Sequence, residues 1–129
     1  MNIPEDLRYT KNDEWIKLDG DSATVGITDY AQDQLSDIVY FEASPGEGDS
    51  LKQGDAFGTV ESVKAASDVY APAAGELEAV NTALADAPEA INSDPYGSWM
   101  IKLKITDASQ VDALMDAAAY KAYIEEREA

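Results

Sequence analysis

Apolar and polar residues alternate in short segments over the first hundred positions, and clusters of Gly, Pro, Asp and Asn separate these segments. The pattern predicts strands at 8–10, 15–18, 23–27, 37–42, 51, 56–63, 68–70, 76–80 and 99–105. The turn Asp19-Gly20-Asp21 predicts a tight hairpin, because Asp-Gly readily supplies positive φ. Thr28 or Asp29 is suited to cap a short helix that ends near Leu35, and 87–92 is predicted to form a single helical turn.

The period of the pattern changes from strand to helix after residue 105. The predicted strand at 99–105 has Trp99, Ile101, Leu103 and Ile105 on one face and Met100, Lys102 and Lys104 on the other. Beyond it, Asp107 is suited to cap a helix and Asp116 to cap a second one. One helical face collects Val111, Leu114, Met115, Ala118, Ala119, Tyr120, Tyr123 and Ile124. Many short strands followed by helix predict a mainly β fold, with a helix or helix pair packed across a small sandwich or barrel.

The length of 129 residues is typical of a single domain, which we expect to span 1–129. The chain contains no Cys and no His. The lack of Cys excludes disulfides, thiolate zinc sites and a Cys nucleophile. The lack of His removes the commonest general base and the commonest metal ligand. Both absences favour a protein that has no catalytic site and no metal site of its own.

The formal net charge is −17 at pH 7, from 26 acidic and 9 basic residues. Such a surface repels phosphate backbones and anionic lipid, so neither nucleic acid nor a membrane is expected as a partner. It favours fast association with basic protein surfaces. No apolar run approaches membrane-spanning length, and the first residues lack the features of a secretory signal. We expect a cytoplasmic protein of bacterial type; a mature mitochondrial form without its presequence would look the same.

Lys64 is the only Lys or Arg between Lys52 and Lys102. It lies between two predicted strands and beside the small apolar residues Val63 and Ala65, so we expect it at a hairpin tip. A long amine in that place is accessible to a modifying enzyme, and acylation would remove its charge. The residues therefore predict a displayed, modified lysine, with an ordinary exposed lysine as the simpler alternative.

Other kinds of chemistry find less support in the sequence. A lysine-dependent enzyme needs a buried amine with acid–base partners, and an exposed Lys64 does not suit that role. Paired carboxylates such as Glu125-Glu126 are expected by chance in a chain this acidic. The turn at 19–21 lacks the closing Glu of a calcium loop. We therefore interpret the chain as a scaffold for one displayed group.

The segment Glu61-Ser62-Val63-Lys64-Ala65-Ala66-Ser67-Asp68 resembles the H protein family of the glycine cleavage system. The resemblance follows the order and spacing of the family over nearly the whole chain. It includes Glu14-Trp15, Val25-Gly26-Ile27-Thr28-Asp29-Tyr30-Ala31-Gln32, Asp37-Ile38-Val39-Tyr40, Asp94-Pro95-Tyr96-Gly97 and Tyr120.

The resemblance implies the barrel-sandwich hybrid fold of lipoyl carriers, with lipoate in amide linkage on Lys64. Such a carrier moves the aminomethyl group of glycine from the pyridoxal-phosphate glycine decarboxylase to the tetrahydrofolate-dependent aminomethyltransferase. Dihydrolipoyl dehydrogenase then reoxidises the arm, which a lipoate ligase or lipoyl transferase had attached. The carrier catalyses none of these steps, but tethering raises the local concentration of the cargo at each active site.

The resemblance also implies roles for residues near Lys64. The expected recognition segment for the modifying enzyme comprises Glu61, Ser62, Val63, Ala65, Ala66 and Asp68. The loaded arm is expected to rest in a surface cleft, where carboxylates would hold its cationic aminomethyl group. By position, Glu14 and Asp68 are the residues expected to hold it.

Three other kinds of carrier are alternatives. An H-like protein that mainly relays lipoyl groups to other enzymes would carry the same segment. Biotin carriers have Met on both sides of the lysine, whereas this chain has Val63 and Ala65, and lipoyl domains of 2-oxoacid dehydrogenases usually have Asp in place of Val63. These domains also lack the leading segment and the C-terminal helix, so the H protein pattern fits better.

The chain departs from the family pattern at four places. Asp13 and Gln34 stand where His is usual or frequent, and Ser36 stands where Gly is common. The loop at 43–48 is one residue longer than the family pattern. These departures concern details that face partners, and they leave the carrier role unchanged.

Overall fold

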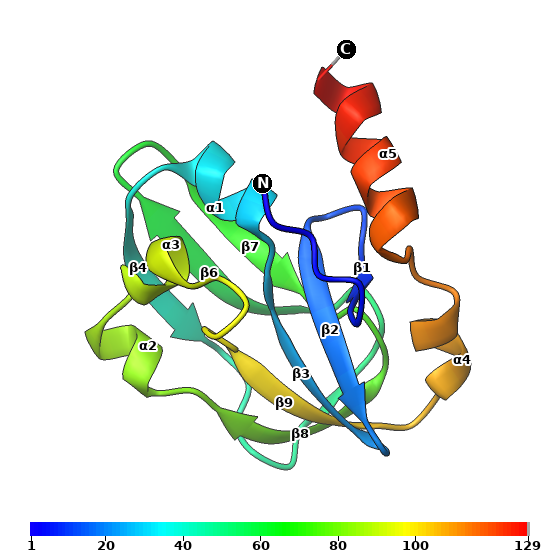
Figure 1. Ribbon diagram of the computed structural model, residues 1–129. Coiled ribbons are helices and arrows are strands. Elements are labelled where there is room, and N and C mark those ends of the chain that lie inside the picture. The colour runs from blue at the N-terminus through cyan, green and yellow to red at the C-terminus, as the bar shows by residue number, and fades with distance from the viewer. Residues whose placement is uncertain (129) are drawn as a thin grey trace.

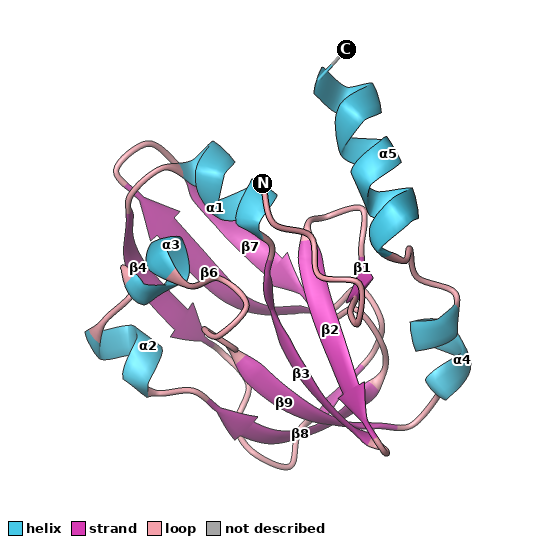
Figure 2. Ribbon diagram, in the orientation of Figure 1, coloured by secondary structure: helices cyan, strands magenta, loops and turns pink. Residues whose placement is uncertain are grey.

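The computed structural model describes residues 1–128, which form two antiparallel sheets with short helices around them (Figures 1 and 2). The strands are β1 (Arg8–Tyr9), β2 (Glu14–Asp19), β3 (Ser22–Ile27), β4 (Ile38–Ala43), β5 (Ser50–Leu51), β6 (Ala56–Ser62), β7 (Ala66–Tyr70), β8 (Gly75–Val80) and β9 (Ile101–Ile105). The helices are α1 (Asp29–Leu35), α2 (Ala83–Asp86), α3 (Ala90–Ser93), α4 (Ala108–Asp112) and α5 (Ala117–Glu128). One sheet has the order β1-β2-β3-β9-β8-β5, and the other has the order β4-β6-β7.

The main core collects the inward side chains of both sheets. It is built by the period-two alternation of the strands: Ile101, Leu103 and Ile105 of β9 are buried, whereas Lys102 and Lys104 are exposed. Fully buried members from the two sheets include Val25, Phe57, Val60, Leu77 and Leu103. The predicted mainly β fold with helices is therefore confirmed.

A second, aromatic cluster attaches α5 to the strands β1 and β2. Its buried members are Leu7, Tyr9, Trp15, Tyr30, Tyr120 and Ile124. The rings of Tyr9 and Tyr120 are stacked, with centroids 4.6 Å apart and an angle of 4° between their planes. Because this cluster lies beside Glu14, it holds the C-terminal helix next to the region where the candidate site forms.

Trp15 requires a glycine on the neighbouring strand. Trp15 of β2 pairs with Gly26 of β3, and a Cβ at position 26 would lie only 2.7 Å from the indole nitrogen. The indole N–H donates to the carbonyl of Pro95 at 3.1 Å. The indole is thus held between β3 and the 94–97 turn, and it fixes the start of β2, where Glu14 lies.

The predicted turns and helix caps are confirmed. Gly20, in the turn between β2 and β3, has φ of +67°. The Thr28 hydroxyl accepts a hydrogen bond from Ala31 N–H, and the Asp107 carboxylate caps α4 in the same way through Ser109. Asp116 accepts from Ala119 N–H at 2.8 Å, so the C-terminal region does divide into two helices.

Three predicted details are wrong, the first two because the backbone departs from a regular period. Met100 is buried although it was predicted on the face of Lys102, because β9 begins only at Ile101 and Met100 N–H bonds instead to Val25. Ala118 and Ala119 are exposed, because the break between α4 and α5 resets the helical phase.

The third error concerns the segment before β9. The helical turn predicted at 87–92 forms at Ala90–Ser93, and a further short helix, Ala83–Asp86, was not predicted. Neither helix has a side-chain cap, which is the signal that marks a helix start in a sequence.

Within residues 1–128, no helix combines the length and apolar composition that crossing a membrane requires.

Ser36 follows α1 with φ of +66° and ψ of −151°, a region that is populated almost only by glycine. We predict that Ser36→Gly stabilises the protein by about 1 kcal/mol, because relief of the strain exceeds the added entropy of the unfolded chain. Chemical denaturation measures this effect. Asp13→Gly is the control: φ at Asp13 is +67°, but its carboxylate is hydrogen-bonded, so that variant should lose stability. A Ser36→Gly protein less stable than the parent would contradict the prediction.

Candidate functional site

Lys64 lies in the three-residue loop 63–65 that joins β6 to β7. The Ser62 hydroxyl organises this loop: it accepts hydrogen bonds from the backbone N–H groups of Lys64 (3.1 Å) and Ala65 (3.0 Å) and contacts the carbonyl of Ala65 at 3.1 Å. The backbone N–H of Ser62 also donates to the Ala65 carbonyl at 2.7 Å. A serine at this place therefore holds the tip of the hairpin in one shape.

The residues around Lys64 face solvent. Among the expected recognition residues, Ser62 is half-buried and the others are exposed, with Val63 at 70%. The Lys64 amine reaches back to the end of α1, where it donates to the carbonyl of Gln34 at 3.3 Å. The β6–β7 loop and α1 lie side by side in Figure 1. The predicted display of Lys64 at a hairpin tip is thus what the structure shows.

Gln34, whose carbonyl the Lys64 amine contacts, is one wall residue of a cleft of about 230 Å³. The cleft is lined by Asn12, Asp13, Glu14, Ile27, Ala31, Gln34, Leu35, Val60, Ser67, Asp68, Val69 and Arg127. The structure therefore brings Glu14 and Asp68, which are 54 positions apart in the sequence, into the lining of one cleft near Lys64.

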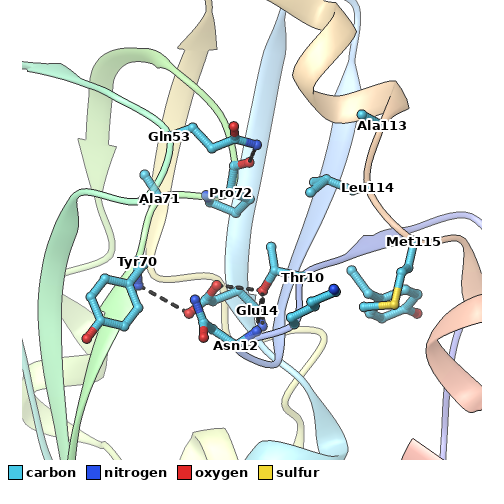
Figure 3. Close-up of a pocket in the computed structure, with 13 residues that line it drawn as sticks. Thr10, Asn12, Glu14, Gln53, Tyr70, Ala71, Pro72, Ala113, Leu114 and Met115 are labelled. Atoms are coloured by element: carbon cyan, nitrogen blue, oxygen red, sulfur yellow. Dashed lines mark hydrogen bonds between the residues drawn. The ribbon is translucent and has the colours of Figure 1, made fainter. Parts of the chain in front are cut away.

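Glu14 is a buried carboxylate, only 2% exposed. One of its oxygens accepts from the Thr10 hydroxyl at 2.6 Å, and the other accepts from the backbone N–H of Tyr70 at 3.2 Å (Figure 3). Burial raises the pKa of Glu14 from 4.5 to about 7, although both hydrogen bonds act to lower it. Glu14 therefore changes charge near neutral pH.

Glu14 also lines a second pocket, of about 300 Å³, on the side of Thr10 and Tyr70. Gln53, Pro72, Leu114 and Met115 complete much of its wall (Figure 3). Asn12 and Glu14 belong to both linings. Glu14 thus contributes to the walls of both cavities.

Asp68 differs from Glu14 in its surroundings. It is exposed, and its carboxylate accepts from the Thr59 hydroxyl on the adjacent strand at 3.3 Å. An exposed carboxylate keeps most of its hydration, so its charge interacts more weakly with a nearby cation than a buried charge does. The cleft therefore combines a buried and an exposed acid.

Asp13, the departure next to Glu14, is paired with Arg127. The guanidinium donates twice to the carboxylate of Asp13, at 2.6 and 3.2 Å, and the Tyr120 hydroxyl donates at 3.0 Å. The guanidinium also lies over the rings of Tyr30 and Tyr123, at 4.7 and 5.0 Å from their centroids. The last turn of α5 is thereby fixed at the rim of the cleft.

Comparison with known proteins gives a consistent answer. The model of the glycine cleavage H-protein family matches residues 7–127. The chain belongs to the glycine cleavage H-protein family. It is 54% identical over 129 residues to a glycine cleavage system H protein of Anaeromyxobacter sp. (strain K), covering 99% of this chain and 100% of that one. It is 56% identical over 123 residues to that of Chlorobium phaeovibrioides, covering 93% and 95%.

The glycine cleavage system H protein of Mycobacterium marinum has a similar solved structure. The two share 36% identity with a TM-score of 0.83, over 98% of this chain and 100% of the other. The expected barrel-sandwich hybrid fold of this H-protein family is thus confirmed, as is the resemblance on which it rested.

Only Glu14 and Asp68 were expected in the cleft, and Arg127 is a charged cleft residue of this H-protein family member that the sequence did not predict. Nothing in its local sequence connects it to Asp13, which is 114 positions away. Only the packing of Tyr120 and Ile124, which lie on α5, into the aromatic cluster brings the two together.

Among residues 1–128, no group of three or more acidic side chains is arranged to hold a metal ion.

The shifted pKa of Glu14 predicts a specific pH dependence of stability. In the unfolded chain, Glu14 has the ordinary glutamate pKa of 4.5, whereas in the folded protein its pKa is about 7. The folded protein therefore binds this proton more tightly than the unfolded chain does. The stability due to Glu14 is therefore complete below pH 4.5 and is lost as the pH rises towards 7. The free energy of unfolding of the parent, minus that of Glu14→Gln, should fall by about 3 kcal/mol between pH 4.5 and 7.5.

Urea denaturation of both proteins at several pH values measures this difference, and the subtraction removes the contribution of the other carboxylates. A difference that does not change with pH would show that Glu14 titrates normally.

Proposed function

We propose that this chain is the lipoyl-carrying shuttle protein of the glycine cleavage system, with lipoate in amide linkage to Lys64. The observation that carries the proposal is the position of the Lys64 amine. It is exposed at a hairpin tip held by Ser62, and it contacts Gln34, which lines the cleft that contains Glu14 and Asp68. A long arm anchored there has access both to solvent and to the cleft.

The lining of the cleft suits a lipoyl arm. Ile27, Ala31, Leu35 and Val60 offer an apolar surface to a hydrocarbon chain and a dithiolane. When bound, lipoate supplies a disulfide that accepts the aminomethyl group of glycine and is reduced in doing so. Glu14 and Asp68 offer carboxylates to a cationic amine on such an arm.

Glu14 would lose its proton when that cationic amine binds beside it. A cation within contact distance favours the ionised carboxylate and lowers the pKa of Glu14 below about 7. The Thr10 hydroxyl and the Tyr70 N–H already hold both oxygens in place, so the ionised form needs no rearrangement. Burial would strengthen the attraction and keep water from the group, which slows its loss.

In this proposal the chain positions and protects its cargo, and other proteins carry out the chemistry. Its complete lack of His and Cys supports this division of labour. The proposed partners are the pyridoxal-phosphate decarboxylase, the tetrahydrofolate-dependent aminomethyltransferase, dihydrolipoyl dehydrogenase and the enzyme that attaches lipoate. The net charge of −17 favours docking on basic surfaces of these proteins.

The first prediction from this proposal is that purified chain incubated with lipoate, ATP and a lipoate ligase gains the mass of one lipoyl group. Lys64→Arg should gain none, because arginine keeps the charge but cannot form the amide. Intact mass spectrometry measures both. Equal gains in the two proteins would place the modification elsewhere. Glycine–bicarbonate exchange with the decarboxylase then distinguishes a shuttle from a lipoate relay, since only a shuttle supports it.

The second prediction concerns the hold on the cargo. Glu14→Gln and Asp68→Asn should each release the aminomethyl group from the loaded protein faster, by roughly tenfold for Glu14 and less for the exposed Asp68. The rate of formaldehyde and ammonia release at pH 8 measures this loss. Asp112→Asn, an exposed acid on α4, makes the same change of charge away from the cleft and should have no effect. Unchanged release in both cleft variants would overturn the assignment.

A further inference from the structure

Exposed apolar side chains gather beside Lys64. Among residues 1–128, five large apolar side chains are exposed, and three of them lie here: Val39 (56%), Tyr40 (41%) and Val63 (70%). We call these three residues the bulge patch. Single exposed apolar residues are ordinary, but a cluster that shares one surface is typical of a contact with another protein.

A β-bulge in β4 creates this patch. The pairing of β4 with β6 shifts between Ile38 and Tyr40, so Val39 is left between the two paired positions. Ile38 and Phe41 are buried, whereas the two residues between them both face outward. A regular strand would have buried one of the two, and bulges commonly redirect side chains in this way.

The backbone places Val63 next to these two residues. Ile38 pairs with Ser62, and the N–H of Val63 donates to the carbonyl of Asp37 at 3.0 Å. Tyr40 lies directly opposite Glu61, three positions before Lys64. The bulge patch therefore adjoins the anchor of the arm on the β4 side.

The edge of the bulge patch is acidic. Asp37, Glu42 and Glu61 are exposed, and the Tyr40 hydroxyl donates to the Glu42 carboxylate. Between Lys17 and Lys102, the sequence contains only two basic residues, Lys52 and Lys64. A complementary protein surface would thus have an apolar centre and a basic edge.

We propose that the bulge patch is the docking surface for the enzyme that acylates Lys64; this inference rests on the proposed function. That enzyme must bring an activated lipoyl donor, lipoyl-adenylate, to the amine itself. The amide N–C bond forms between Nζ and the lipoyl carbonyl carbon, the bond from that carbon to the phosphate oxygen breaks so that AMP leaves, and the ammonium group releases two of its three protons to solvent while the amide keeps the third. Enzymes that act on the cargo meet the far end of a long arm, so they need no contact next to Nζ.

The test compares lipoylation rates of variants with a purified lipoate ligase, lipoate and ATP. Val39→Ser with Tyr40→Ser should lower kcat/KM for modification of Lys64 about tenfold, as loss of a central apolar contact does. Leu18→Ser is the matched control, since Leu18 on β2 is 38% exposed outside the bulge patch. It should stay within twofold of the parent. Thermal unfolding checks that all variants are folded.

A second measurement separates docking of the ligase from a general defect. The double variant, fully lipoylated by prolonged incubation, should be reoxidised by dihydrolipoyl dehydrogenase at the parent rate. Parent-like lipoylation of the double variant would overturn the inference, and so would an equal loss in both assays. If the parent itself gains no lipoyl mass, the proposed function fails as well.

Discussion

The buried carboxylate of Glu14 connects the two sheets of this protein. It stands at the start of β2 in the six-stranded sheet and accepts the N–H of Tyr70 at the end of β7 in the three-stranded sheet. The Thr10 hydroxyl satisfies its second oxygen. A buried carboxyl group without such partners would cost several kcal/mol. The position of β7 against β2 is therefore tied to this side chain, which also lines the candidate cleft.

The burial of Glu14 between the two sheets also affects its proposed role in binding a cationic cargo. If Glu14 served only to link the two sheets, the folded protein would be more stable at neutral pH with a lower pKa at this residue. Burial instead holds the pKa of Glu14 near 7. The protein thus keeps a group that ionises most readily when a cation comes near it. Neighbouring Asp13 would add a second charge, but its two hydrogen bonds from Arg127 engage that charge and attach it to α5. Of the acidic side chains that line the cleft, Glu14 and Asp68 are therefore the two that are not paired with Arg127.

The three-stranded sheet carries most of the residues to which functions are proposed. Its hairpin between β6 and β7 displays Lys64, the end of β7 reaches Glu14, and the bulge in β4 exposes Val39 and Tyr40. The larger sheet and the aromatic cluster hold these parts in place. Ser62 in the hairpin and Trp15 against Gly26 serve the same purpose, because each fixes a short segment that carries a functional residue.

Local sequence determined the features that depend on neighbours in the chain. Alternation predicted most strands, Asp19-Gly20-Asp21 predicted its hairpin, and Thr28, Asp107 and Asp116 predicted helix starts, because each signal acts over a few residues. The isolation of Lys64 between two β segments indicated its display at a hairpin tip, and the resemblance of the surrounding segment to the H-protein family supplied the expected positions of Glu14 and Asp68.

Tertiary structure alone decided the features that depend on distant partners. The pKa of Glu14 is raised because both sheets bury it. Arg127 pairs with Asp13 because α5 packs beside β1 and β2. Val39 and Tyr40 are both exposed because β4 contains a β-bulge. Met100 was misplaced for the same reason, since its burial depends on where pairing with Val25 begins. A periodic pattern predicts which residues share a face only where the backbone stays regular. It does not predict which residues of the opposite element pack against that face.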